Sequence, residues 1–135
     1  MNNITFTYPP SPLLTQREDV PETNICNSLN KPEQCQNMEI CECVHVEQIP
    51  LGANVELIIV DQGGDSEETI FHLHGYKFYI VGHRNFEKPA TLSTIRRLNE
   101  EGRLLKRNFI SPAIKDTVRV PKFGVVVVRF IANNP

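Results

Sequence analysis

The sequence lacks long apolar runs and has almost no net charge. Its apolar stretches, such as Val125 to Val128, are of strand length, far short of the roughly 18 to 20 residues that a membrane-spanning helix needs. The formal net charge is −2, whereas nucleic-acid-binding domains usually carry a strongly basic surface. We therefore predict a chain with no membrane span and no nucleic-acid partner.

The first ten residues also lack the cationic start and the apolar core of a secretory signal. If the parent protein is secreted, we expect its beginning to lie outside this chain. The triplet Asn3-Ile4-Thr5 fits a glycosylation acceptor, which agrees with an oxidising compartment.

Cysteine is confined to one short region, at Cys26, Cys35, Cys41 and Cys43. The Cys41-Glu42-Cys43 spacing is too tight for a zinc-binding CxxC pair, and Cys26 and Cys35 have no histidine at zinc-finger spacing. We therefore predict two local disulfides. Three connectivities remain open, and reduced thiols are the alternative if the chain stays in a cytosol.

The pattern of the chain changes near residue 42. Residues 1–41 form a segment rich in proline and cysteine, in which only 2–8 alternates like a strand. We expect the rest of this segment to be loop, because proline removes backbone donors from any sheet. Residues 42–135 are expected to form the β core of the same domain. Val44 to Ile49 and Val55 to Val60 look like paired strands around a turn at 50–53.

Further strand patterns occur at 77–83, 116–120 and 125–131, and 125–131 is apolar enough to be buried on both faces. One segment differs: Leu92, Ile95 and Leu98 recur at helical spacing within 91–101, before Gly102. These patterns predict an all-β fold, a Greek-key β-sandwich with one short helix.

His72 and His74 form the candidate metal site. Side chains two apart in a strand point to the same face, so the two imidazoles should lie side by side while Leu73 packs on the opposite face. Gly75 leaves room for a ligand to approach. Structural histidines are the alternative for such a pair, and structural or surface roles are expected for His45 and His83.

Other chemistries find no support. Ser66, Ser93 and Ser111 lie in no nucleophile elbow, and no phosphate-binding glycine loop precedes a helix. We assign no catalytic and no organic cofactor-binding residue. Glu67 and Glu68 border the histidine pair, but a solvated loop is the simpler interpretation.

Phe71-His72-Leu73-His74-Gly75-Tyr76-Lys77-Phe78 resembles the histidine motif in the last domain of multicopper oxidases. Further segments match the laccase pattern in order: 12–16, the cysteine cluster, 49–51, 109, 112–113, 115–118 and 129–135. The cysteine arrangement resembles insect laccases more than fungal ones. The resemblance implies a third, plastocyanin-like cupredoxin domain.

In that family the third domain shares a trinuclear copper cluster with the first cupredoxin domain, where dioxygen is reduced to water. Phenolic substrates give electrons at a separate type 1 copper. By position, the resemblance implies that His72 binds the type 2 copper and His74 one copper of the type 3 pair. It also implies an extracellular parent. Asp116, in a matching segment, could orient a histidine or water near copper, or cap a turn.

The sequence departs from the family at the type 1 site. Thr69 stands where the motif usually has the type 1 histidine, and Ile70 where proline usually follows. The chain also stops at Pro135, before the His-Cys-His segment, so we expect an incomplete sandwich in which 125–131 lacks sheet partners. Two interpretations stay open: a copper-binding fragment of a laccase-like enzyme, inactive alone, or a degenerate, inactive cupredoxin-like module.

Overall fold

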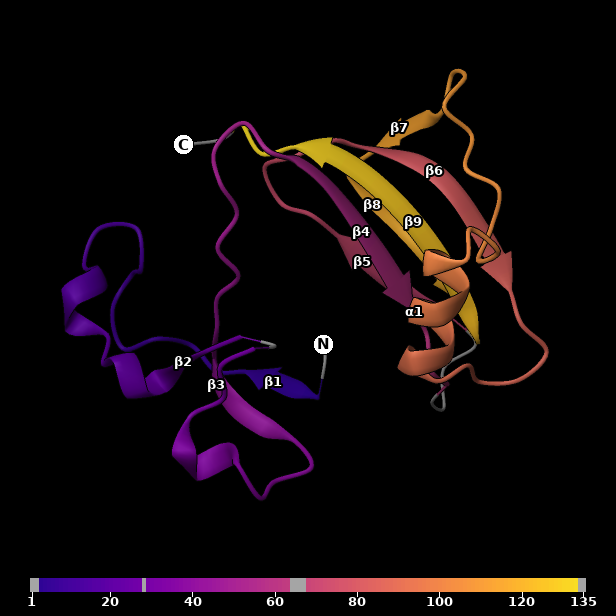
Figure 1. Ribbon diagram of the computed structural model, residues 1–135. Helices are drawn as coiled ribbons and strands as arrows, with labels where there is room; N and C mark the ends of the chain where they lie inside the picture. The colour runs from indigo at the N-terminus through magenta and orange to yellow at the C-terminus, as the bar shows by residue number, and fades with distance from the viewer. Residues whose placement is uncertain (1–2, 28, 64–67, 134–135) are drawn as a thin grey trace. The chain divides into compact units, whose positions relative to one another are not determined.

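The computed structural model describes residues 3–27, 29–63 and 68–133 (Figure 1). The chain divides into two compact units, Met1–Gln48 and Ile49–Pro135. Each unit has buried side chains of its own. The candidate histidines belong to the second unit.

The first unit is built around three short parallel strands. In it, β3 (Cys41–His45) lies between β1 (Ile4–Phe6) and β2 (Ile25–Cys26). The connections contain three 3-10 helices, η1 (Arg17–Asp19), η2 (Glu22–Asn24) and η3 (Glu33–Cys35). Pro21 and Pro32 directly precede the second and third of these as N-cap residues.

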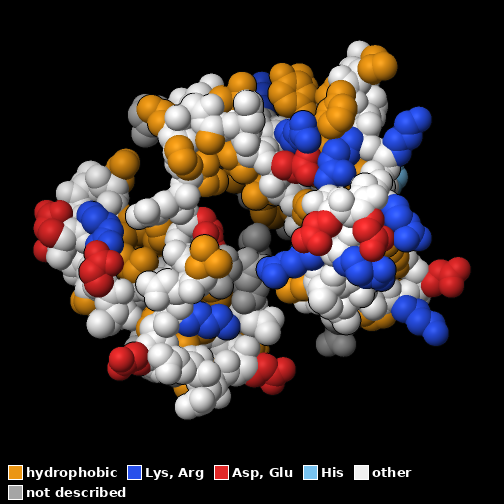
Figure 2. All heavy atoms as spheres, viewed as in Figure 1, with side chains coloured by type: hydrophobic (Ala, Val, Ile, Leu, Met, Phe, Trp, Pro, Cys, Tyr) orange, Lys and Arg blue, Asp and Glu red, His pale blue; other side chains and the backbone are white. Residues whose placement is uncertain are grey.

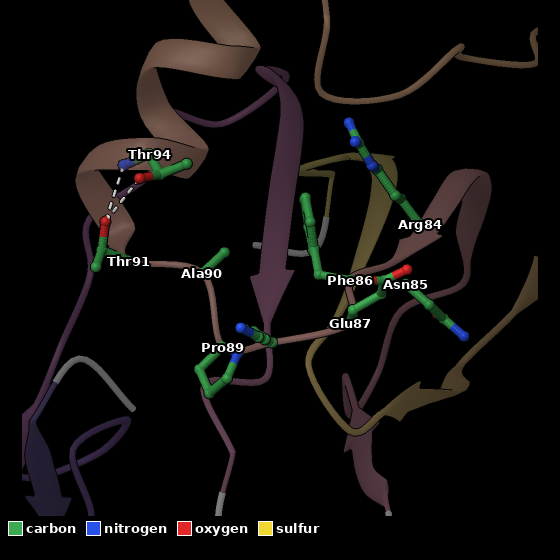
Figure 3. Close-up of a pocket in the computed structure, with 9 residues that line it drawn as sticks. Arg84, Asn85, Phe86, Glu87, Pro89, Ala90, Thr91 and Thr94 are labelled. Atoms are coloured by element: carbon green, nitrogen blue, oxygen red, sulfur yellow. Dashed lines mark hydrogen bonds between the residues drawn. The ribbon is translucent and has the colours of Figure 1, made fainter.

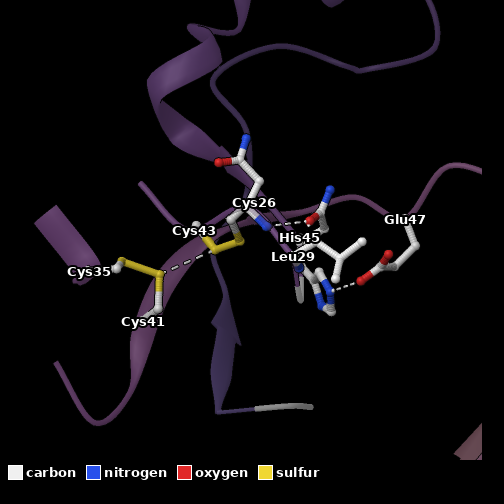
Figure 4. Close-up of a disulfide and its surroundings, with 9 residues drawn as sticks. Cys26, Leu29, Cys35, Cys41, Cys43, His45 and Glu47 are labelled. Atoms are coloured by element: carbon white, nitrogen blue, oxygen red, sulfur yellow. Dashed lines mark hydrogen bonds and ion pairs between the residues drawn. A yellow bond between two sulfur atoms is a disulfide. The ribbon is translucent and has the colours of Figure 1, made fainter. Parts of the chain in front are cut away.

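Two disulfides hold this unit together, Cys26–Cys43 and Cys35–Cys41 (Figure 4). All four cysteines are buried, together with Ile4. Cys41 and Cys43 are two apart in β3 and therefore share a face, and their Sγ atoms lie 3.6 Å apart. The prediction of two disulfides is confirmed, and the structure selects one of the three connectivities.

The predicted pairing of the strands on either side of the 50–53 turn was wrong. β3 pairs with β1 and β2, whereas β4 (Asn54–Val60) pairs with β9 (Gly124–Ile131). The disulfides attach β3 to its own unit. The apolar run of β4 instead lies opposite the valines of β9, which gives a longer set of cross-strand apolar pairs.

The second unit is an all-β sandwich with one short helix, as predicted. Its larger sheet is antiparallel, in the order β4-β9-β6-β7, with β6 at Phe78–Asn85 and β7 at Ala113–Lys115. Its smaller sheet pairs β5 (Glu68–His72) with β8 (Thr117–Pro121). Side chains of both sheets meet in one core, which includes Phe71, Phe78, Val118, Val120, Val126, Val128 and Phe130.

The strand β9 lies inside the larger sheet, hydrogen-bonded to β4 on one side and to β6 on the other (Figure 1). Val126 and Val128 belong to the core between the sheets, and Val125 and Val127 to the cluster beneath the helix. The predicted burial of both faces is therefore confirmed. The expectation that this strand would lack sheet partners was wrong.

The helix α1 spans Leu92–Glu100 and begins at Thr91, whose Oγ1 accepts a hydrogen bond from the Thr94 N–H at 3.2 Å. Ile95, on the inner face of this helix, is buried. Acidic and basic side chains mix over this region of the surface (Figure 2), where Glu101 pairs with Arg97 at 3.4 Å and with Arg103 at 3.1 Å. Among the described residues, no helix is long and apolar enough to cross a bilayer.

Candidate copper site

His72 and His74 lie at the end of β5, where side chains alternate between core and solvent. Phe71 and Leu73 pack against the core, whereas His72 and His74 are exposed. The strand ends at His72, so the prediction that both histidines lie in one strand was wrong for His74, which occupies the following turn. The two rings nevertheless lie side by side, with centroids 5.8 Å apart and planes at 58°.

The turn after β5 depends on Gly75, whose φ of +79° places it in the left-handed region. Side chains with a Cβ rarely adopt this conformation. The turn lets the chain leave β5 immediately after the histidines and continue to β6. The positive φ gives glycine at this position a backbone reason, whereas the expectation that Gly75 leaves room for a ligand stays a prediction.

The neighbouring strand β8 holds the ring of His72. Thr117 lies directly opposite His72 in the antiparallel pair, and His72 Nδ1 is 2.8 Å from Thr117 Oγ1. Thr117 Oγ1 in turn donates a hydrogen bond to Asp116 Oδ1 at 2.9 Å. The sequence suggested a role for Asp116 but missed Thr117, because only the pairing of two distant strands brings it to the ring.

Thr69, at the position where the resemblance implies a type 1 histidine, serves a different purpose. Its hydroxyl donates to Asp61 Oδ2 at 3.1 Å, while Asp61 Oδ1 accepts the backbone N–H groups of Gly63 at 2.8 Å and Phe123 at 3.0 Å. Desolvation raises the pKa of Asp61, but these hydrogen bonds outweigh it and the net pKa is lowered. The carboxylate therefore favours its charged, acceptor-only form.

The other polar candidates have contacts or positions of their own. His45 contacts Glu47 at 3.0 Å in the first unit, and His83 is exposed on β6. Glu68 pairs with Arg119 at 3.0 Å. Glu67 lies outside the described residues.

A third ligand for the histidine pair is missing from residues 3–27, 29–63 and 68–133. In those ranges, the one group of three or more converging His, Cys, Asp or Glu ligand atoms is Cys26, Cys41 and Cys43. Its sulfur atoms are already used in disulfides. The described part of the chain thus offers two imidazoles, and no complete metal shell around them.

A pocket of about 680 Å³ lies beside the start of α1 (Figure 3). Its lining has no histidine or cysteine: Arg84, Asn85, Phe86, Glu87, Lys88, Pro89, Ala90, Thr91 and Thr94. Asn85 pairs with Gly124, just beyond the end of β8, whereas His72 pairs with the first residue of β8. The pocket is therefore separate from the histidines.

The residues at the end of β5 fit a partial copper site. Imidazole is a suitable ligand for copper, and both rings are exposed. Metal-binding histidines usually donate from their second ring nitrogen to a supporting group, and His72 has such a group in Thr117. The arrangement could supply two ligands to copper, provided that other donors complete the shell.

Comparisons with known proteins agree with this chemistry. The family model described as multicopper oxidase matches residues 6–135. Laccase-22 of Oryza sativa subsp. japonica is 28% identical over 147 residues, an alignment that covers 100% of this chain and 24% of the relative. Laccase-12 of the same rice is 30% identical over 150 residues, with 100% and 24% covered.

Laccase-12 of Arabidopsis thaliana is 35% identical over 91 residues, which covers 65% of this chain and 14% of the relative. The chain spans about a quarter of the length of the rice relatives. Because the family model matches nearly all of its residues, the chain belongs to the multicopper oxidase family.

Proposed function

We propose that this chain is the copper-binding third cupredoxin domain of a laccase-like multicopper oxidase, with His72 a ligand of the type 2 copper and His74 of the type 3 pair. The observation that supports this most directly is the pair of adjacent, exposed imidazoles in a chain of this family. Bound copper would supply dioxygen reduction coupled to the oxidation of phenols or diphenols in the full-length parent.

The remaining copper ligands are proposed to come from the first cupredoxin domain of that parent. Two imidazoles cannot satisfy the coordination of a copper cluster, since each ion needs several converging donors and a supporting shell. The rice relatives are about four times as long as the aligned region, which leaves ample chain for such a domain.

If another domain supplies the remaining copper ligands, the role of this chain's own residues is to hold and orient the two imidazoles. The pairing of β5 with β8 fixes the backbone of His72, and Phe71 and Leu73 anchor that backbone in the core. Two buried disulfides support an extracellular parent, because such bonds persist in oxidising compartments. The insect-type character of the chain stays a prediction, since the relatives described above are plant proteins.

The second candidate is a degenerate, catalytically inactive cupredoxin-like module without a type 1 site. The hydrogen bond from Thr69 to Asp61 favours it, because a hydroxyl engaged with a carboxylate is a poor replacement for an imidazole at copper. In this candidate the histidine pair marks ancestry, and copper binding is lost or has no redox consequence.

Titration of the purified chain with Cu²⁺, followed by calorimetry and electron paramagnetic resonance, tests the proposal. We expect binding with nitrogen hyperfine structure from two imidazoles, and its loss in the His72→Ala, His74→Ala double variant. His83→Ala, which removes an exposed histidine elsewhere, is the matched control. Equal copper binding by the wild type and the double variant would contradict the proposal.

An assay for oxidation of a diphenol tests whether the copper site needs ligands from another domain. The chain alone is expected to be inactive, because it offers two of the necessary ligands. Copper-dependent oxidation by the chain alone would show that the proposed dependence on another domain is wrong.

A further inference from the structure

We propose that Thr117 is a positioning residue, which fixes the proton of His72 on Nδ1 and so presents the bare Nε2 to copper. Three side chains form a directed chain of hydrogen bonds, from His72 through Thr117 to Asp116. The part of this inference that concerns copper rests on the proposed function. The part that concerns the proton stands on the geometry of the chain itself.

The direction of the two hydrogen bonds follows from counting protons. A threonine hydroxyl has one proton, and an ionised carboxylate can only accept. The contact of 2.9 Å between Thr117 Oγ1 and Asp116 Oδ1 therefore uses the proton of Thr117. At 2.8 Å from His72 Nδ1, the oxygen can then only accept, so Nδ1 must carry the donor proton.

A neutral imidazole has one N–H, and its other nitrogen carries a free lone pair. If Nδ1 is the donor, Nε2 is the nitrogen with the lone pair. A metal ion binds that lone pair without first shifting a proton around the ring. Asp116 therefore sets the ring's proton although it touches only Thr117.

Strand geometry holds the three groups in place. Leu73 N–H donates to the backbone oxygen of Asp116 at 3.0 Å, just beyond the last residue pair of the ladder. That last pair is His72 and Thr117, and side chains directly opposite each other in an antiparallel pair lie close enough to interact. All three side chains are exposed, so register rather than burial keeps them together.

This arrangement opposes the intrinsic preference of histidine. In water, a neutral histidine side chain prefers to carry its proton on Nε2, the nitrogen that is free here. Removing the hydroxyl of Thr117 should therefore return the ring to its ordinary preference. Removing the carboxylate of Asp116 should act in the same direction, because the hydroxyl proton is then free to turn toward Nδ1.

Nitrogen-15 NMR of the metal-free chain, at a pH where the ring is neutral, reads the tautomer directly. We expect the Nδ1–H form at His72 in the wild type and in Thr117→Ser, which keeps the hydroxyl. We expect the Nε2–H form in Thr117→Val, which keeps the β-branched shape, and in Asp116→Ala. Thr69→Val is the matched control, since it removes a hydroxyl from the same sheet at a different register position.

A second readout is the affinity for Cu²⁺. Loss of a supporting group typically lowers metal affinity by about 10-fold to 100-fold; we expect a loss of this size in Thr117→Val and recovery in Thr117→Ser. The Nε2–H form in the wild type, or an unchanged tautomer in Thr117→Val, would overturn the inference. If no variant binds copper, the proposed function fails, while the NMR result still decides the role of Thr117.

Discussion

The hydroxyl of Thr69 donates a hydrogen bond to Oδ2 of Asp61, 3.1 Å away. The other oxygen of Asp61 holds the backbone of Gly63 and of Phe123, in the turn between β8 and β9. One carboxylate thus joins the end of β4, the start of β5 and that turn. At the position where the resemblance implies an electron-entry ligand, the chain has a structural link.

Thr69→His should not create a type 1 copper site. Such a site needs a cysteine thiolate beside the histidines, and all four cysteines form disulfides. We expect no intense visible copper–thiolate absorption when Cu²⁺ is added to the variant. Loss of the Asp61 bond should lower the free energy of unfolding by about 0.5 to 1.5 kcal/mol, measured by urea denaturation.

Thr69→Val is the control for this variant, because it removes the same hydroxyl without adding an imidazole. We expect it to lower the free energy of unfolding by a similar amount. An intense visible band in Thr69→His would contradict the expectation that no type 1 site forms. An unchanged free energy of unfolding in Thr69→Val would contradict the structural role assigned to Thr69.

The sequence pattern correctly predicted those elements that depend on residues close together in the chain. Leu92, Ile95 and Leu98 share one helical face, and the structure has a helix from Leu92 to Glu100 with Thr91 as its cap. The apolar strand β9 was likewise recognised as buried on both faces. In each case the side chains that determine the element lie within a few residues of one another.

Relationships between distant segments could not be predicted in the same way. Thr117 reaches His72 across 45 positions of sequence, and only the register of β5 against β8 brings them together. The pairing of β4 with β9 depends on a partner about 70 residues away. The disulfide connectivity is similar, because the spacing of four cysteines allows several loops and only the packing around β3 selects one.

Glu56 should make the stability of the second unit dependent on pH. Its carboxylate accepts two hydrogen bonds from Arg107, at 2.6 and 3.0 Å, and one from Arg129 at 2.6 Å. The hydrogen bond from Arg107 is the largest cause of the lowered pKa of Glu56, against an opposing effect of desolvation. A lowered pKa in the folded state means that ionisation of Glu56 favours folding.

This stabilisation is fully present above the ordinary pKa of a glutamate, about 4.3, and is lost as the pH falls through the lower pKa of folded Glu56. We expect Glu56→Gln to lower the free energy of unfolding by about 1 to 3 kcal/mol at neutral pH. The difference from the wild type should shrink below pH of about 4. Urea denaturation at a series of pH values measures it.

Glu100→Gln, on the exposed side of α1, is the control for Glu56→Gln. It should change the free energy of unfolding little at any pH, since exposed charges contribute weakly. A difference between wild type and Glu56→Gln that stays constant down to acid pH would contradict the assigned role of the Glu56 charge.

Ile95 should anchor α1 to the larger sheet. It is 3% exposed and packs in a cluster with Val81, Leu104, Val125 and Val127. Ile95→Ala is expected to lower the free energy of unfolding by about 2 to 5 kcal/mol, because it removes apolar contacts and leaves a cavity. Leu92→Ala, at a position 44% exposed in the same helix, should have a smaller effect; equal effects would refute the anchoring role.

Reduction of the disulfides should unfold the first unit and leave the second folded. The buried cluster of the first unit consists of Ile4 and the four cysteines, and outside it only Val20 and Val44 are buried among the described apolar residues of this unit. The cross-linked cysteines therefore supply most of its interior. Removing a disulfide typically lowers stability by about 2 to 4 kcal/mol. The second unit has two apolar clusters of its own, which contain no cysteine.

Hydrogen exchange of the whole chain, followed by mass spectrometry with and without dithiothreitol, measures this difference. We expect amides of β1 and β3 to lose protection on reduction, and amides of β6 and β9 to keep it, because the larger sheet is held by side chains that reduction does not alter. The oxidised chain with oxidised dithiothreitol is the control. Equal loss of protection in β9 would mean that the second unit draws its stability from the disulfides, which its valine-rich core argues against.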